Sequence, residues 1–389
     1  MQKPIRFFAT NRDRHNLGRN VNREQRIQLQ NGGYHWVDMK KYMAHYLATT
    51  EPSSMPPEVI ITNSEKDVFK VFLGKNSVKH IVIGIHGYNV SFHGALTSFS
   101  VLADTLSIAL KGFDTTLITD PIVDEKFEAA HDGENVKSVN IKYDSILEDP
   151  NKELIAFVGF SWSSNGKVVD YLSDRADALG AAPALANLIG YIRTQNPNAK
   201  IHIIAHSMGN YLTCYMLGEL VNKTIKPIYY NNAIERQLQR QYQGGQNAFF
   251  IDRYLMLAPD VERREVTQCD VDSMSGTGSE YNGPFFEGLQ HLVQETHVFY
   301  SRYDNVLKAS VVEKEVVHES LQRGIEVVTG PNLQKRWESS LGLNPLPALA
   351  PDNMESHNAT TLTNRTIDHG DYFDALDIAK KIAEVIMKD

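Results

Sequence analysis

The sequence predicts an α/β protein whose central sheet is mostly parallel and is covered by helices. Short runs rich in β-branched residues alternate with longer segments of helical periodicity, a pattern typical of this class. Several runs are continuously apolar, as expected for strands that are buried on both faces. The chain has 389 residues, of which 42% are hydrophobic, and this is enough for a sizeable core. We predict a single domain over residues 1–389.

The predicted strands are the short apolar and β-branched runs of the chain. They lie at Val59–Thr62, Val68–Leu73, His80–Ile85, Leu154–Phe160, Lys200–Ala205, Arg253–Leu257, His297–Tyr300, Ile325–Thr329 and Arg365–Ile367. An amphipathic helix is predicted over Phe373 to Lys388, because its apolar residues recur on or near one helical face.

Three polar or proline-rich stretches are predicted as insertions into this core, at about 112–150, 221–250 and 331–363. Loops of this length are usually functional lids or disordered segments. The first mixes apolar side chains with charges, as a cover with one apolar face would. We therefore expect 112–150 to border a substrate cleft, with a solvated surface loop on the far side of the sheet as the alternative.

Composition narrows the possible partners and the compartment. Lys and Arg number 39 and Asp and Glu number 47, so the net charge is −8, which argues against nucleic acid as the main partner. Two cysteines, Cys214 and Cys269, are too few for a disulfide framework. No apolar run approaches the length of a transmembrane helix, and the N-terminus does not resemble a secretory signal. We expect a cytoplasmic protein.

The segment from Lys200 to Leu212 carries the strongest chemical signal. An apolar strand leads into His206-Ser207-Met208, and a helical pattern follows. Small residues, Ala205 and Gly209, flank Ser207 by two positions on either side, as a nucleophile elbow requires where strand and helix backbones approach closely. Ser207 is the predicted nucleophile. Ser161 is a weaker rival, because Ser163 replaces the closing small residue there.

A serine nucleophile needs a base and an acid that orients the base. Asp304 follows the strand that ends at Tyr300, and we favour it as the acid over Asp260, which follows the preceding strand. His369 is the predicted base, because it lies in a loop after the last predicted strand and before the last helix. The other downstream histidines are His291, His297, His318 and His357, of which His357 is a weak candidate.

Backbone N–H groups usually stabilise the oxyanion in acyl transfer. One predicted donor is Met208, the residue after the nucleophile. The other is Tyr88, since the early strand ends in His86-Gly87 and glycine lets the following loop turn in closely.

The elbow, the acid and base candidates and the loop after the early strand together resemble the α/β-hydrolase superfamily. Four strings make the resemblance narrower, and they are Phe7 to Arg12, His86 to Phe92, Phe160 to Gly166 and Ala205 to Asn210. In that order they are similar to the bacterial α/β-hydrolase family known only as domain of unknown function 900, over roughly residues 5–310. The resemblance implies an α/β-hydrolase fold with Ser207 as nucleophile, and it supports Asp304 more strongly than His369. It implies no particular substrate.

The sequence thus predicts a serine hydrolase that cleaves a small-molecule carboxylic ester through an acyl-enzyme. A thioesterase or amidase with the same triad is one alternative, and a non-catalytic binding protein of the same fold is another. The predicted reaction needs no cofactor. No metal site is predicted, because the acidic residues show no ligand spacing and His15, His35 and His45 are scattered.

Overall fold

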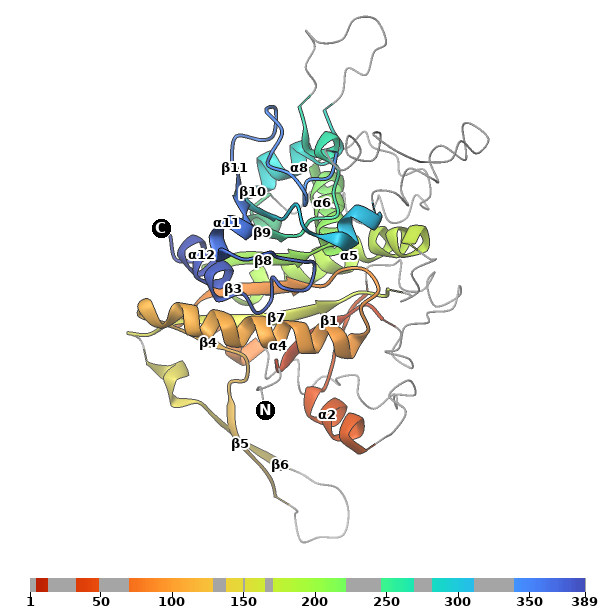
Figure 1. Ribbon diagram of the computed structural model, residues 1–389. Helices are drawn as coiled ribbons and strands as arrows, with labels where there is room; N and C mark the ends of the chain where they lie inside the picture. The colour runs from red at the N-terminus through yellow and green to blue at the C-terminus, as the bar shows by residue number, and fades with distance from the viewer. Residues whose placement is uncertain are drawn as a thin grey trace, which may run out of the picture.

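A computed structural model describes residues 5–12, 33–48, 70–128, 138–149, 151–164, 171–221, 246–268, 282–310 and 339–388. Its centre is a sheet with the strand order β11-β10-β9-β8-β3-β7-β1-β2, and β4 also pairs with β7. Every pairing in this sheet is parallel among the described residues except that of β1 with β2. The predicted fold class, a mostly parallel sheet flanked by helices, is confirmed (Figure 1).

The strands of the main sheet are short and mostly buried. Their bounds are β1 Phe7–Thr10, β2 His35–Trp36, β3 Val78–Ile85, β4 Thr115–Ile118, β7 Glu153–Ser161, β8 Lys200–His206, β9 Ile251–Leu257, β10 Val293–Tyr300 and β11 Met354–Asn358. The predicted strands at 80–85, 154–160, 200–205, 253–257 and 297–300 are confirmed within these bounds. Those at 59–62 and 325–329 lie outside the described residues.

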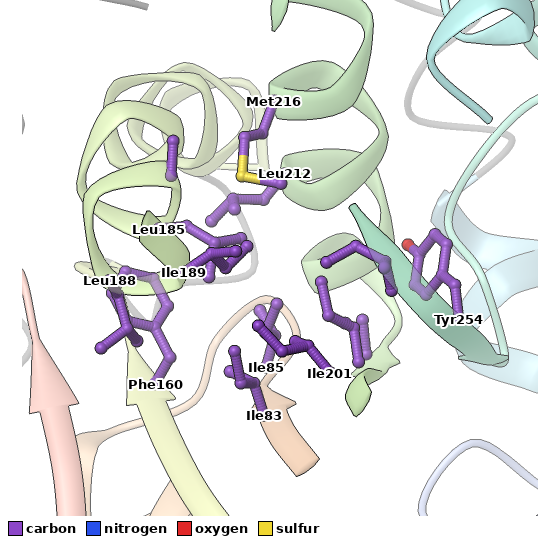
Figure 2. Close-up of a cluster of buried hydrophobic side chains, with 14 of the residues drawn as sticks. Ile83, Ile85, Phe160, Leu185, Leu188, Ile189, Ile201, Leu212, Met216 and Tyr254 are labelled. Carbon is purple, nitrogen blue, oxygen red and sulfur yellow. The ribbon is translucent and has the colours of Figure 1, made fainter. Parts of the chain in front are cut away.

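Helices pack on both faces of the sheet (Figure 1). Helices α5 (Tyr171–Gln195), α6 (Met208–Val221) and α8 (Phe286–Leu292) cover one face, and α4 (Phe92–Ala109) and α12 (Leu376–Ile386) cover the other. Two further helices are α2 (Met39–Ala48) and α11 (Ala359–Thr363). Figure 2 shows the first face, where Leu185 and Ile189 of α5 point toward β3, the strand that carries Ile83 and Ile85. Burial of this apolar surface on two faces holds the strand ends in fixed positions.

Two predicted strands, Val68–Leu73 and Arg365–Ile367, are wrong. The described part of the first, residues 70–73, is helical. An unbroken apolar run such as Val71-Phe72-Leu73 suits a strand or a helix, and the tertiary context decides between them. Arg365–Ile367 is irregular, and the strand at this edge is β11, which pairs in parallel with β10. Since β11 and α11 lie within the predicted insertion 331–363, its last ten residues belong to the core layers.

The expectation that 112–150 borders the substrate cleft is wrong for its described residues. Strand β4 pairs with the first half of β7, where Thr115 lies opposite Glu153, so the segment attaches at the amino ends of the strands. The hairpin of β5 (Ile122–Glu128) and β6 (Ser138–Tyr143) extends away from that edge (Figure 1). Ser77, just before β3, donates to the carbonyl of Leu147, which holds the segment's end there as well. Ligands of parallel sheets bind at the opposite, carboxyl ends.

The predicted amphipathic C-terminal helix is present as α12. Most of the predicted insertion 221–250 lies outside the described residues. Among the helices that the structure describes, none is both long and apolar enough to cross a membrane.

Candidate active site

Ser207 stands in the tight turn between β8 and α6, at the carboxyl end of the sheet. Its φ of 53° lies in the left-handed region, which is costly for a residue with a Cβ and is typical of a nucleophile elbow. The turn is fixed from two sides, because the Ser207 N–H donates to the carbonyl of Leu257 (3.0 Å) and the Ser207 carbonyl accepts from the N–H of Asp260 (3.2 Å).

Gly209 explains why the elbow needs a small residue. A Cβ at this position would lie 2.5 Å from the carbonyl oxygen of His86 and 2.8 Å from that of Ile85. Helix α6 therefore starts directly against the end of β3, and any side chain at 209 would separate them. Ala205, at the other flanking position, is fully buried.

The loop after β3 lies against the serine. A Cβ at Gly87 would be only 2.7 Å from the Cβ of Ser207, so the backbone at Gly87 passes directly beside this serine. Tyr88 is the next residue, and its ring packs edge-on against the ring of Tyr171 at 5.7 Å. Met208 is the first residue of α6, where backbone N–H groups have no acceptor within the helix. Of the two residues predicted as oxyanion donors, Met208 therefore directly follows Ser207, and Tyr88 directly follows the glycine that lies against Ser207.

His369 and Asp304 form a direct pair. The Nδ1 of His369 lies 2.7 Å from the Oδ2 of Asp304, which is fully buried. The second carboxylate oxygen of Asp304 accepts from the backbone N–H of Leu307 (2.9 Å), so the acid is held on both sides. The His369 side chain keeps 15% of its surface exposed, so solvent reaches the ring.

The loop that carries His369 is anchored to the elbow. Nε2 of His206 donates to the backbone carbonyl of His369 (2.8 Å), and the two imidazole centroids lie 4.5 Å apart. Burial, with a smaller contribution from His369, keeps the pKa of His206 well below its usual value, so this ring is neutral. Asp368 adds a second anchor, since its carboxylate accepts from the backbone N–H of Asn305 (3.0 Å).

Asp260, the alternative acid, is engaged elsewhere. The hydroxyl of Tyr171 donates to its Oδ2 (2.6 Å), and the hydroxyl of Ser310 donates to its Oδ1 (2.8 Å). The carboxylate that contacts His369 is that of Asp304, with 2.7 Å between Nδ1 and Oδ2, so Asp304 remains the favoured acid. The ring of Tyr171 also packs against that of Tyr88. Asp260 therefore helps, through Tyr171, to position the loop after β3.

Ser161, the rival serine, is fully buried and lies under the loop after β3. Its hydroxyl accepts from Nε of Arg12 (2.9 Å) and donates to Nε2 of His86 (3.1 Å), while Nδ1 of His86 donates to the carbonyl of Gly87 (2.8 Å). Burial, followed by the nearby charge of Arg12, lowers the pKa of His86 to about 3, so the ring stays neutral. Ser161 thus belongs to a buried polar network.

Sequence reasoning missed the roles of Arg12 and His86. The guanidinium of Arg12 also donates to the carbonyl of Val90 (2.7 Å), and the Trp162 indole donates to the carbonyl of His86 (2.7 Å). The signal was present in three of the quoted strings, which contain Arg12, His86 and Trp162. The contacts among these residues form only in the tertiary fold. They fix the loop that carries Tyr88, through hydrogen bonds to its carbonyl groups.

The other downstream histidines that the structure describes lie away from the elbow. His291 is on the surface of α8, and His297 and His357 bond to each other on β10 and β11. His318 lies outside the described residues.

The parallel sheet with an elbow serine at a strand end defines an α/β-hydrolase fold. The chain belongs to the family described as "Alpha/beta hydrolase of unknown function", DUF900, whose model matches residues 61–365. It is thus a member of a hydrolase family, and the resemblance seen in the sequence is confirmed. An uncharacterized protein of Nostoc sp. (strain PCC 7120), alr1448, is 64% identical over 98% of this chain and 93% of its own length.

Several solved structures are similar at low identity. Aspergillus fumigatus lipase B is 12% identical, with a TM-score of 0.31, over 77% of this chain and 50% of its own. The product of Listeria innocua lin2722 is 12% identical with a TM-score of 0.35, over 80% of this chain and 95% of its own. An acetyl xylan esterase is 9% identical with a TM-score of 0.29, over 79% and 99%. This chain thus spans about half the length of the fungal lipase.

Proposed function

We propose that the protein is a serine hydrolase that cleaves a small carboxylic ester through an acyl-enzyme at Ser207. The observation that carries the proposal is the combination of a strained elbow serine with a buried Asp304 that lies 2.7 Å from His369 on the loop anchored to that elbow. These are the nucleophile, base and orienting acid that acyl transfer requires.

In the acylation step, Nε2 of His369 takes the proton of the Ser207 hydroxyl as the oxygen attacks the ester carbonyl carbon. Asp304 accepts from Nδ1–H of His369, which leaves Nε2 as the free base and stabilises the imidazolium that forms. His369 then donates its proton to the leaving alkoxide, and the alcohol departs.

The negative charge that develops on the carbonyl oxygen needs donors fixed in advance. The backbone N–H groups of Tyr88 and Met208 serve this role, because Gly87 holds the first loop against Ser207 and Met208 opens α6. The positive end of the α6 dipole adds to the stabilisation. In deacylation a water attacks the acyl group, with His369 again acting as base and then as acid.

The test is hydrolysis of p-nitrophenyl esters with short, medium and long acyl chains, with matched thioesters and anilides in parallel. We expect the esters to be cleaved and Ser207→Ala to lower kcat by about 10⁴-fold or more. Faster cleavage of thioesters or anilides would change the proposed leaving group but not the proposed triad. A Ser207→Ala variant as active as the wild type would refute the proposal.

A further inference from the structure

A second cluster of side chains that can bind a ligand lies at the opposite edge of the sheet from β2, on strands β10 and β11. The parallel register sets His297 beside Glu355 and Phe299 beside His357. Since residues two apart on a strand share a face, His297, Glu355 and His357 project from the same face. They lie on the far side of β9 from the elbow strand β8 and play no part in the chemistry proposed for Ser207.

The three side chains bring potential metal-ligand atoms close together. Nδ1 of His297 lies 3.0 Å from Nε2 of His357, and a carboxylate oxygen of Glu355 lies 3.7 Å from Nδ1 of His297. One ligand atom from each of the three residues falls within 4.8 Å of the others. Ligands at about 2.1 Å from a tetrahedral Zn²⁺ are about 3.4 Å apart, so the spacing needs only small side-chain adjustments.

A carboxylate outside the cluster orients His297. Oε2 of Glu295 lies 3.3 Å from Nε2 of His297, so this nitrogen carries the ring proton and Nδ1 presents its lone pair to the cluster. A carboxylate that accepts from the distal nitrogen of a histidine is the usual support of a metal-binding imidazole.

His357 can also present an unprotonated ring nitrogen to the cluster, and the change of tautomer that this needs leaves its charge unchanged. Without a metal, the Nε2–H of His357 donates to Nδ1 of His297, because that nitrogen has no proton. When the ring proton of His357 moves to Nδ1, it faces Oε1 of Glu355 at 3.7 Å. Both facing imidazole nitrogens are then free for a cation.

We propose that His297, His357 and Glu355 form a binding site for a divalent metal ion of the Zn²⁺ type. Two imidazoles and one carboxylate form a ligand set that suits Zn²⁺, and an open fourth position remains for water. The carboxylate end of the site is accessible, since 62% of the Glu355 side chain is exposed while both histidines are buried.

The chain contains its own comparison for this site. His80 and His202 meet through Nδ1 and Nε2 at 2.9 Å with nearly parallel rings, a contact similar to that of His297 with His357. Around that pair the nearby charges are cationic, from Lys200 and Arg253. At the proposed site the Glu355 carboxylate lies 3.7 Å from Nδ1 of each histidine. Glu295 adds a second carboxylate, which Arg253 (3.7 Å) and Lys388 (3.3 Å) also contact, and Lys381 is a further nearby cation. The pair on β3 and β8 is therefore a hydrogen bond between neutral rings, and the pair on β10 and β11 is suited to a metal.

The experiment is isothermal titration calorimetry of the chelator-treated full chain with ZnCl₂, together with thermal unfolding at each metal ratio. We expect one equivalent to bind saturably and to raise Tm. Glu355→Gln and His357→Gln should each weaken binding by at least about tenfold. His80→Gln is the matched control, because it breaks the similar histidine pair and should bind Zn²⁺ as the wild type does.

Glu355→Gln decides the matter if His357→Gln does not fold, since Glu355 is on the surface. The proposal is overturned if no saturable equivalent binds, or if Glu355→Gln binds Zn²⁺ within about twofold of the wild type, a change too small for a lost ligand. Zn²⁺ binding that is lost in His80→Gln and kept in Glu355→Gln would assign the metal to the other pair, which also overturns the proposal.

Discussion

Gly87→Ala tests the proposed oxyanion loop without removing any reacting group. The added Cβ would start 2.7 Å from the Cβ of Ser207 and 3.2 Å from Nδ1 of His206. Carbon atoms in contact prefer about 3.5–4.0 Å, so the loop must retreat by about 1 Å. Oxyanion donors act at about 2.7–3.1 Å, and losing one costs about 10²–10³ in kcat. We predict a loss of this size for Gly87→Ala.

The assay is steady-state hydrolysis of the best p-nitrophenyl ester, with urea unfolding to check stability. Gly370→Ala is the matched control, because it adds the same methyl group beside His369 and a Cβ there has no neighbour within 4 Å. We expect Gly370→Ala to keep kcat within about threefold, since substitutions that touch nothing have small effects. A fully active, stable Gly87→Ala variant would refute the placement of the Tyr88 donor beside Ser207.

The remaining predictions concern the acid, the rival serine and pH. Asp304→Asn should lower kcat by about 10⁴-fold, because His369 loses the partner that fixes its tautomer, whereas Asp260→Asn should keep most of kcat; equal losses in the two variants would contradict this assignment. Ser161→Ala should keep kcat within about tenfold but lower the free energy of unfolding by about 1–3 kcal/mol, because it leaves buried polar partners unpaired; inactivation of a stable variant would contradict that reading. Burial lowers the pKa of His80 and of His357 to about 4, so in the unfolded chain these rings gain protons below about pH 6.5 while the folded rings stay neutral. Stability should be highest above pH 6.5 and fall by about 1.4 kcal/mol per pH unit for each ring down to about pH 4, and urea unfolding that is unchanged between pH 7 and pH 5 would contradict the prediction.

The elbow could be predicted from sequence because its requirements are local. An apolar strand, Ser207 and the small residues around it all lie within ten positions, and the clash at Gly209 shows why a small residue is needed there. Asp304 was assigned from chain order and from the end of a strand, β10. The strand expected before His369 is absent, so that assignment depends on chain order and on the position before the last helix. The structure brings the two side chains to 2.7 Å from each other.

Features that depend on residues distant in sequence could not be predicted in the same way. Strand β11 is polar, with Glu355, Ser356 and His357 in sequence, so it carries neither an apolar run nor clean alternation. The apparent lid over 112–150 had the right composition, but composition does not specify which end of the sheet a segment joins. Likewise, the contact of Arg12 with Ser161 spans 149 positions and forms only in the folded chain.

Covalent labelling of the nucleophile tests the central claim most directly. The full chain is treated with a fluorophosphonate, digested and mapped by mass spectrometry, with Ser207→Ala and Ser161→Ala treated in parallel. We predict a single phosphonylated site on Ser207 in the wild type and in Ser161→Ala, and no label in Ser207→Ala. Modification of Ser161, or an unlabelled wild type that still hydrolyses esters, would contradict Ser207 as the nucleophile.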